Sequence, residues 1–150
     1  MVFQRLPSQA AETSVIVSAA FLGPVLVKLF PMQEAAQVVV SAHLTGAWLL
    51  SLIFLATIAL AMIGLNPVLT STLVVAIIGD PATFGVTPIN VVAVLLTAWA
   101  LAAQFSPYTG TAAIVSRMFN VSPVRLIFVQ NGPFMVLSLG IALTGIYLIF

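Results

Sequence analysis

Residues 66–72 read Asn-Pro-Val-Leu-Thr-Ser-Thr, and residues 106–111 read Ser-Pro-Tyr-Thr-Gly-Thr. In each stretch an apolar run is interrupted by a residue type that caps helices, then by a proline, then by hydroxyl side chains. Irregular polar backbone at membrane depth is tolerated only where it is buried in protein or lines a cavity. Paired interruptions of this kind point to the binding site of a secondary transporter. The first break (residues 66–72) and the second break (residues 106–111) therefore guide both the fold and the functional hypothesis.

The composition predicts an integral membrane protein. Apolar residues make up 62% of the 150 residues and charged residues only 5%, and the mean hydropathy is +1.26. A soluble domain carries about 25% charged residues, so this chain has too few charges to solvate a globular surface. We expect a multi-pass protein of the cell (inner) membrane, with the lipid bilayer as a partner. The net charge of +1 gives no indication of a nucleic-acid partner.

The apolar segments predict an all-α fold, a polytopic transmembrane helical bundle that forms one membrane domain over residues 1–150. Two of its helices are expected to be broken or re-entrant, because a segment of 13 residues covers only about 20 Å at 1.5 Å per residue. Residues 31–43 are expected to form a loop and a helix entry. The expected helical segments are 14–30, 44–64, a half-helix at 67–79, 89–104, a half-helix at 108–119, and 126–150.

The few charged residues bear on targeting and orientation. Arg5 precedes the apolar run 14–30, as in a signal peptide, but it is one charge well upstream and no small-x-small cleavage motif follows. A retained helix is therefore expected. Lys28, Arg117 and Arg125 can share one side of the membrane, and the positive-inside rule would make that side cytoplasmic.

Helix contacts within a membrane favour small residues, which let backbones approach closely. Aromatic residues with a polar group favour the membrane interfaces, so Trp48 and Tyr147 are expected there. Trp99 lies deep in its segment and fits either an interface or the bundle interior. Three pairs have the small-xxx-small spacing: Ala19/Gly23, Ala98/Ala102 and Gly140/Thr144.

Each break is expected to start a new helix. Asn66 and Ser106 are favoured N-cap residues, and Pro67 and Pro107 would then occupy the first helical position. A helix N-terminus carries free amides and the positive dipole end, equivalent to about half an elementary charge. Two such ends that meet inside a bundle would attract an anion without a buried lysine or arginine. The expected substrate- or ion-binding residues are Asn66, Thr70, Ser71, Thr72, Ser106, Thr109, Gly110 and Thr111.

A purely structural role of the breaks is the alternative. Each Asn-Pro or Ser-Pro step also fits a turn before a spanning helix, or a proline kink whose backbone is satisfied by nearby hydroxyls. Two secondary candidates have a similar alternative. Asp80 follows a half-helix and suits a loop or cap, with ion coupling as the second interpretation. Asn131 belongs to a third polar break at residues 130–133, which fits helix–helix hydrogen bonding as well as a site.

The residue inventory limits the chemistry. The chain has no cysteine, one histidine and three acidic residues, so neither a metal site nor a cofactor site is expected. It shows no Ser/His/Asp set and no phosphate-binding loop, so we do not expect an enzyme. The expected function is secondary active transport of a small anion, a carboxylate or an oxyanion, by alternating access, with sodium as a candidate coupling ion. The alternatives are a non-transporting membrane subunit or scaffold, and a channel or permease for a neutral solute.

Residues 44–133 resemble one half of the ion transporter superfamily, which includes divalent-anion:sodium symporters, arsenite/antimonite permeases and the large subunits of TRAP transporters. The segments that carry the resemblance are Gly-Leu-Asn-Pro at 64–67, Thr-Ser-Thr at 70–72 and Phe-Ser-Pro-Tyr-Thr-Gly-Thr at 105–111. The resemblance implies two inverted repeats, with Asn, Pro, Ser and Thr at the helix breaks binding carboxylate-bearing anions and sodium. It also implies that this chain is a C-terminal half or fragment, whose partner is a missing N-terminal half or another copy in a homo-oligomer.

Overall fold

The computed structural model describes residues 6–149, with side chains from residue 13 onward except that of residue 15, and this part is helical without a strand. It confirms the all-α prediction. Short connections separate the helical elements. These are α1 (Leu6–Leu29), α2 (Met32–Ser41), α3 (Gly46–Met62), α4 (Pro67–Ile78), the 3₁₀ turn η2 (Pro81–Phe84), α5 (Pro88–Phe105), α6 (Gly110–Met118), α7 (Pro123–Arg125), the π-helical turn η3 (Leu126–Gln130) and α8 (Gly132–Ile149).

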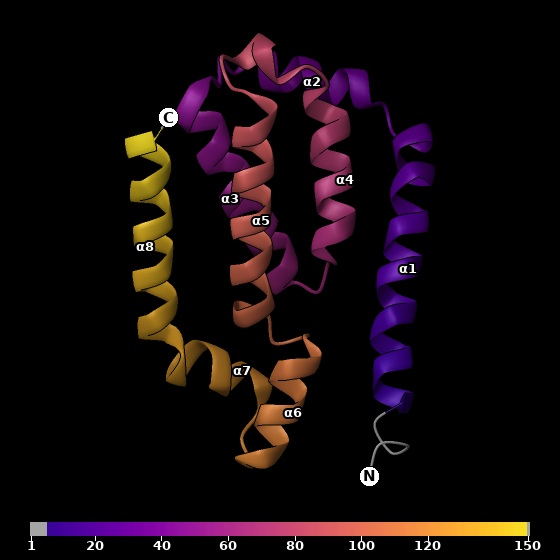
Figure 1. Cartoon of the computed structure of the whole chain (residues 1–150), viewed down its shortest axis with the longest axis vertical. Helices are drawn as coiled ribbons and strands as arrows, with labels where there is room; N and C mark the ends of the chain where they lie inside the picture. The colour runs from indigo at the N-terminus through magenta and orange to yellow at the C-terminus, as the bar shows by residue number, and fades with distance from the viewer. Residues whose placement is uncertain (1–5, 150) are drawn as a thin grey trace.

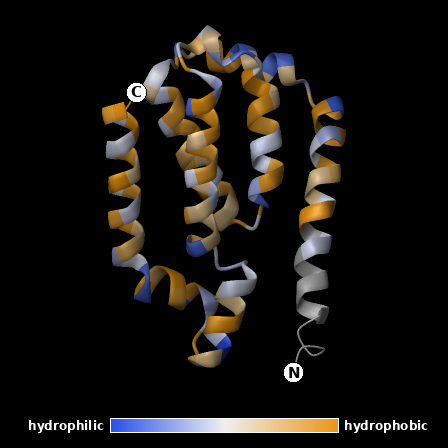
Figure 2. Cartoon of the chain, viewed as in Figure 1, coloured by the Kyte–Doolittle hydropathy of each residue, from blue (hydrophilic) through white to orange (hydrophobic). Residues whose placement is uncertain are grey.

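The long helices stand side by side, with short elements at both ends of the bundle (Figure 1). Helices α2 and η2 lie at the upper end, and α6 and α7 lie at the lower end. The hairpin of α3 and α4 turns back above the level at which α1 and α8 have their lower ends. Apolar residues run along the middle of the bundle, and hydrophilic residues gather at its two ends (Figure 2).

The core lies mainly between α3 and α5. Buried residues of α3 recur at helical spacing, from Leu49 through Phe54 to Ala61, and form one continuous stripe. This stripe packs against a similar one on α5 that includes Ala98, Ala102 and Phe105. The last turn of α3 and the last turn of α5 are therefore held together, and these turns lead into the two breaks.

Two helical stretches are long and apolar enough to cross a membrane: residues 88–118, which combine α5 and α6, and α8. A third is obtained if residues 16–29 and α2, which meet at 79°, form one bent span. The expected full-length span at 44–64 is shorter than predicted, because α3 has only 17 residues before its C-terminal turn. The predicted half-helix at 67–79 is confirmed as α4, with 12 residues.

Two boundaries differ from the prediction. Residues 31–43, expected as a loop and a helix entry, contain the helix α2 over residues 32–41, because Pro31 ends α1 and an amphipathic stretch with Gln33, Glu34 and Gln37 follows. The span expected at 126–150 is interrupted. Pro133 has no amide to donate, and the preceding turn widens so that Asn131 N–H bonds to Leu126 O in the π-helical pattern of η3.

The predicted grouping of cationic residues is wrong. Lys28 lies in the last turn of α1, next to α2 at the upper end of the bundle. Arg117 ends α6 and Arg125 ends α7, and both elements lie at the lower end. Helix α3 runs down, α4 runs back up, and α5 and α6 run down again, so the chain reaches the lower end of the bundle at α6 and α7 (Figure 1). Arg5 lies outside the described residues.

Two of the three small-residue pairs lie in helix contacts. Ala98 and Ala102 are buried between α5 and α3, and Gly23 is buried where α1 packs on α4. A Cβ atom built on Gly23 would come within 2.8 Å of Thr72 Cγ2, so only glycine fits this contact. The third pair, Gly140 and Thr144, is exposed on α8, so it does not lie in a helix contact within the described residues.

A Schellman motif closes α3 and requires glycine. Gly64 has a φ of +97°, its amide donates to Ala61 O at 3.0 Å, and the Leu65 amide donates to Leu60 O at 3.0 Å. A side chain at this φ is strained, and a Cβ atom on Gly64 would also lie 3.5 Å from the Tyr108 ring.

We expect Gly64→Ala to lower the free energy of unfolding by about 1–2 kcal/mol, the cost of a left-handed conformation for an L-residue. The matched control is Gly140→Ala, at a helical glycine where a new Cβ atom meets nothing within 4 Å, and it should be neutral or stabilising. Thermal unfolding of both variants in detergent measures the difference. Equal stability of the two variants would contradict the assigned turn.

Candidate functional site

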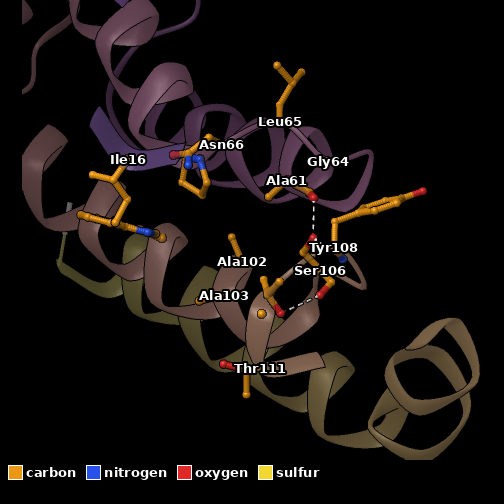
Figure 3. A pocket seen from close by; sticks show the side chains of 14 residues that line it. Ile16, Ala61, Gly64, Leu65, Asn66, Ala102, Ala103, Ser106, Tyr108 and Thr111 are labelled. Carbon is orange, nitrogen blue, oxygen red and sulfur yellow. Dashed lines mark hydrogen bonds between the residues drawn. The ribbon is translucent and has the colours of Figure 1, made fainter. Parts of the chain in front are cut away.

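The two breaks border one pocket of about 450 Å³, between the lower end of the α3–α4 hairpin and the α5–α6 connection (Figure 3). The prediction that the breaks come together is consistent with this geometry. The pocket is lined by Ile16, Ala61, Gly64, Leu65, Asn66, Pro67, Trp99, Ala102, Ala103, Ser106, Tyr108, Thr109, Gly110 and Thr111.

The first break begins α4 as expected. Asn66 is the N-cap: its Oδ1 accepts from the Val68 amide at 2.9 Å, and Pro67 occupies the first helical position. Asn66 is half-buried and lines the pocket. Within the described part of the chain its side-chain NH₂ has no acceptor, which leaves it able to donate to a solute.

The hydroxyl side chains of the first break are not among the residues that line the pocket, so the structure does not bring them together with the second break there. Thr70, Ser71 and Thr72 each donate to the carbonyl four residues earlier, at 3.5, 2.8 and 2.9 Å respectively. Such back-bonding satisfies a hydroxyl inside a helix when no other partner is near. Thr72 also forms the contact with Gly23. The hydrogen bonds of these three hydroxyls fit the structural alternative, in which hydroxyls near a proline break satisfy the backbone of their own helix.

The second break starts its helix later than predicted. Ser106 is the C-cap of α5 rather than the N-cap of α6, and the helix begins at Gly110 with Thr109 as its N-cap. The Ser106 Oγ donates to Ala61 O at 2.7 Å, across a sequence distance of 45 residues. Ser106 is only 4% exposed, so its hydroxyl needs a partner within the protein. This bond draws Ser106 toward α3 and away from α6.

Three residues of the second break remain at the start of α6. The Thr109 hydroxyl donates to Ser106 O and accepts from the Ala112 amide, both at 3.2 Å, so the protein already occupies it. Gly110 and Thr111 contribute the next two amides, which have no acceptor within the described residues. Both residues line the pocket and are exposed. They offer the donor pair that an anion at a helix N-terminus uses.

The two helices that begin at the pocket run away from it in opposite directions. Helix α4 runs upward from the pocket and α6 runs downward (Figure 1). Each therefore presents the positive end of its dipole, about half an elementary charge, to the same space. No lysine or arginine is among the lining residues. A helix start from each break therefore borders the pocket, and that of α4 is already capped by Asn66.

Trp99 and Tyr108 line the pocket and were absent from the predicted site. Trp99 shares one face of α5 with Ala102, Ala103 and Ser106, at the i, i+3, i+4 and i+7 positions, and this spacing could have identified it. The Tyr108 ring lies against Gly64 and extends away from the alanines of α5, and Tyr108 is 70% exposed (Figure 3).

The secondary candidates lie outside the pocket. The Asp80 carboxylate accepts from the Ala82 amide at 3.0 Å and caps η2, at the opposite end of the bundle. This is the loop role that was its first interpretation. Asn131 joins η3 to α8, with its carbonyl accepting from the Met135 amide at 2.9 Å. The described residues hold no group of three His, Asp or Glu able to bind a metal.

A second cavity of about 580 Å³ lies between α1, α2 and α4. Its wall is almost wholly apolar, with Leu69, Leu73 and Ile77 of α4 facing Leu26 and Phe30. It offers no set of donors for a polar solute, so the candidate site is the pocket at the breaks.

Comparison with protein-family models, with curated proteins and with solved structures finds no match for this chain. The resemblance to the ion transporter superfamily therefore stays a prediction that rests on the two breaks.

We expect Ser106→Ala to lower the free energy of unfolding by about 1 kcal/mol, since it removes a buried hydrogen bond and leaves Ala61 O with one donor fewer. Ser116→Ala is the matched control, because Ser116 is equally buried but donates only to Ala113 O within its own helix. Chemical denaturation of both variants in detergent provides the comparison. If Ser116→Ala proves the more damaging change, the bond between the breaks is not a principal contact.

Proposed function

We propose that this chain is a secondary active transporter, or part of one, that moves a small anion across a membrane by alternating access. The observation that carries the proposal is the single pocket bordered by both breaks, with the N-termini of α4 and α6 directed at it from opposite sides. Anions bind at helix N-termini through free amides and the helix dipole. Broken helices that meet at a site are the usual architecture of secondary transporters.

The membrane setting of the proposal rests on the apolar helices. Helix α8 and the α5–α6 stretch have the length and composition of membrane spans. Only 11% of α8 is buried within the chain, and its exposed residues include Val136, Leu137, Ile141 and Leu148. We assign this face to the bilayer or to a partner, either another copy of the chain or a second half of the transporter.

The proposed ligands are fewer than the sequence suggested. The Asn66 amide and the amides of Gly110 and Thr111 would hold the anion, with the Thr111 hydroxyl beside them. Ser106 would hold the second break against α3 and Thr109 would shape the start of α6, because their hydroxyls are occupied within the protein. Sodium remains the proposed coupling ion, and its ligands would be backbone oxygens of the two breaks.

A permease for a neutral solute is the second candidate. The pocket has no cationic side chain, and its donors would serve an uncharged polar molecule as well. Introducing a negative charge into the pocket separates the two candidates, because only an anion is repelled by it.

Asn66→Asp makes that change while it keeps the N-cap, since aspartate caps helices as well as asparagine does. The control is Thr87→Asp, a cap substitution at the start of α5, whose N-cap side chain accepts from the Asn90 amide. With purified protein in liposomes, we expect uptake of radiolabelled acetate to fall at least about tenfold in Asn66→Asp and to be unchanged in Thr87→Asp. About tenfold corresponds to 1.4 kcal/mol, a modest share of the repulsion between two charges at close range.

Uptake of radiolabelled acetamide by the same liposomes provides the contrast. If wild-type protein carries acetamide but not acetate, the chain is a neutral-solute permease. If neither solute is carried and neither binds, the transport proposal fails.

A further inference from the structure

The pocket at the breaks is larger than an inorganic oxyanion requires. Its volume of about 450 Å³ falls within the range of about 300–1,000 Å³ that is typical of sites for small organic molecules. An anion such as sulfate has only five heavy atoms and would fill a minor part of this space. The remainder must be occupied by water or by the body of a larger solute.

The wall of the pocket favours an apolar body. Away from the donors of α6, the lining consists of Ile16, Leu65 and Trp99 together with the alanines of α3 and α5. Ala61 and Ala102 are at most 3% exposed and form the floor of the pocket, whereas Trp99 is 43% exposed and lies on its open side. Water against such a wall lacks hydrogen-bond partners, and apolar surface gains about 25 cal/mol per Å² when it is removed from water.

The charge that the pocket can balance is small. The residues that line the pocket include no aspartate, glutamate, lysine, arginine or histidine. The two helix N-termini together supply at most about one elementary positive charge, because Pro67 has no N–H and Asn66 caps the Val68 amide of α4. A single carboxylate matches this charge, whereas a second negative charge would have no partner and would retain its desolvation cost.

We propose that the solute is a small organic monoanion with an aliphatic or aromatic body, and that its body packs against Trp99 while its carboxylate meets the amides of Gly110 and Thr111. This inference rests on the proposed function and narrows its substrate class. Inorganic oxyanions and dicarboxylates are then poor ligands. Trp99 is the residue that selects the body of the solute.

Tryptophan fluorescence tests the inference directly, because the chain has only two tryptophans. Trp48 lies outside the pocket and packs edge-on against Tyr147, with ring centroids 5.6 Å apart. The Trp48→Phe variant therefore reports on the pocket through Trp99, and the Trp99→Phe variant is the matched control. The probes are cyclohexanecarboxylate, its neutral analogue cyclohexylmethanol, cyclohexane-1,2-dicarboxylate, acetate and sulfate, none of which absorbs at the excitation wavelength. The protein is embedded in lipid nanodiscs.

We expect cyclohexanecarboxylate to give a saturable change in Trp48→Phe and none in Trp99→Phe, with an affinity at least tenfold above that of each other probe. Acetate or sulfate binding as tightly as cyclohexanecarboxylate would overturn the substrate class and leave the anion transporter intact. Equal affinity for cyclohexylmethanol would overturn the anion preference and with it the proposed function. The absence of any response, with wild-type protein also showing no acetate uptake, would overturn both.

Discussion

The hydrogen bond from Ser106 Oγ to Ala61 O joins the second break to the last turn of α3, which leads into the first break, and the candidate site is built around it. Ala61 lies in the last turn of α3, where the helix leaves its final carbonyls without intrahelical partners. The Gly64 amide and the Ser106 hydroxyl supply the donors at this carbonyl, from the same turn and from the end of α5 respectively. The other side-chain hydrogen bonds of the breaks are local and fix only the shape of their own turns. Without the bond between Ser106 and Ala61, the breaks would be neighbours only through apolar packing.

An apolar surrounding also explains which polar groups remain for a solute. A hydroxyl among apolar side chains needs a partner, so the half-buried Ser71 and Thr72 donate to carbonyls of their own helix. Thr109 is used in both directions by its own turn. The groups left over are the Asn66 amide and the first amides of α6, because a helix start has more donors than its cap can satisfy. The chemistry of the pocket follows from this surplus.

Much of the helical architecture could be predicted from the sequence. Hydropathy and the prolines located α4 and the break after α5, and the capping preference of asparagine correctly identified Asn66 as an N-cap. The errors arose where tertiary contacts decide between local options. Ser106 was a reasonable N-cap by residue type, but the carbonyl of Ala61 competes for its hydroxyl, and nothing in the local sequence shows that carbonyl. The interruption at Asn131 was recognised as polar, whereas its effect on the helix geometry through Pro133 was not.

The candidate site was predicted in outline and not in detail. Proline-broken segments pointed to the correct region, because they mark the places where backbone amides become free. Residue type alone could not separate hydroxyls that line the pocket from those that bond within α4. Trp99 was not predicted, because the candidate residues came only from the two breaks. Its spacing of seven residues from Ser106 places both on one face of α5, and this spacing is visible in the sequence.

Proximity of the two breaks is the central claim, and cross-linking tests it most directly, since the natural chain contains no cysteine. Cysteines at Leu65 and Tyr108, which both line the pocket, would be treated with a short bis-maleimide and the product measured by mass spectrometry. The control pair is Leu65 with Ile89, which is closer in sequence and lies at the start of α5, at the opposite end of the bundle. The account predicts efficient intramolecular cross-linking of the first pair and little of the second. Cross-linking of the control pair in preference to the pair at the breaks would contradict it.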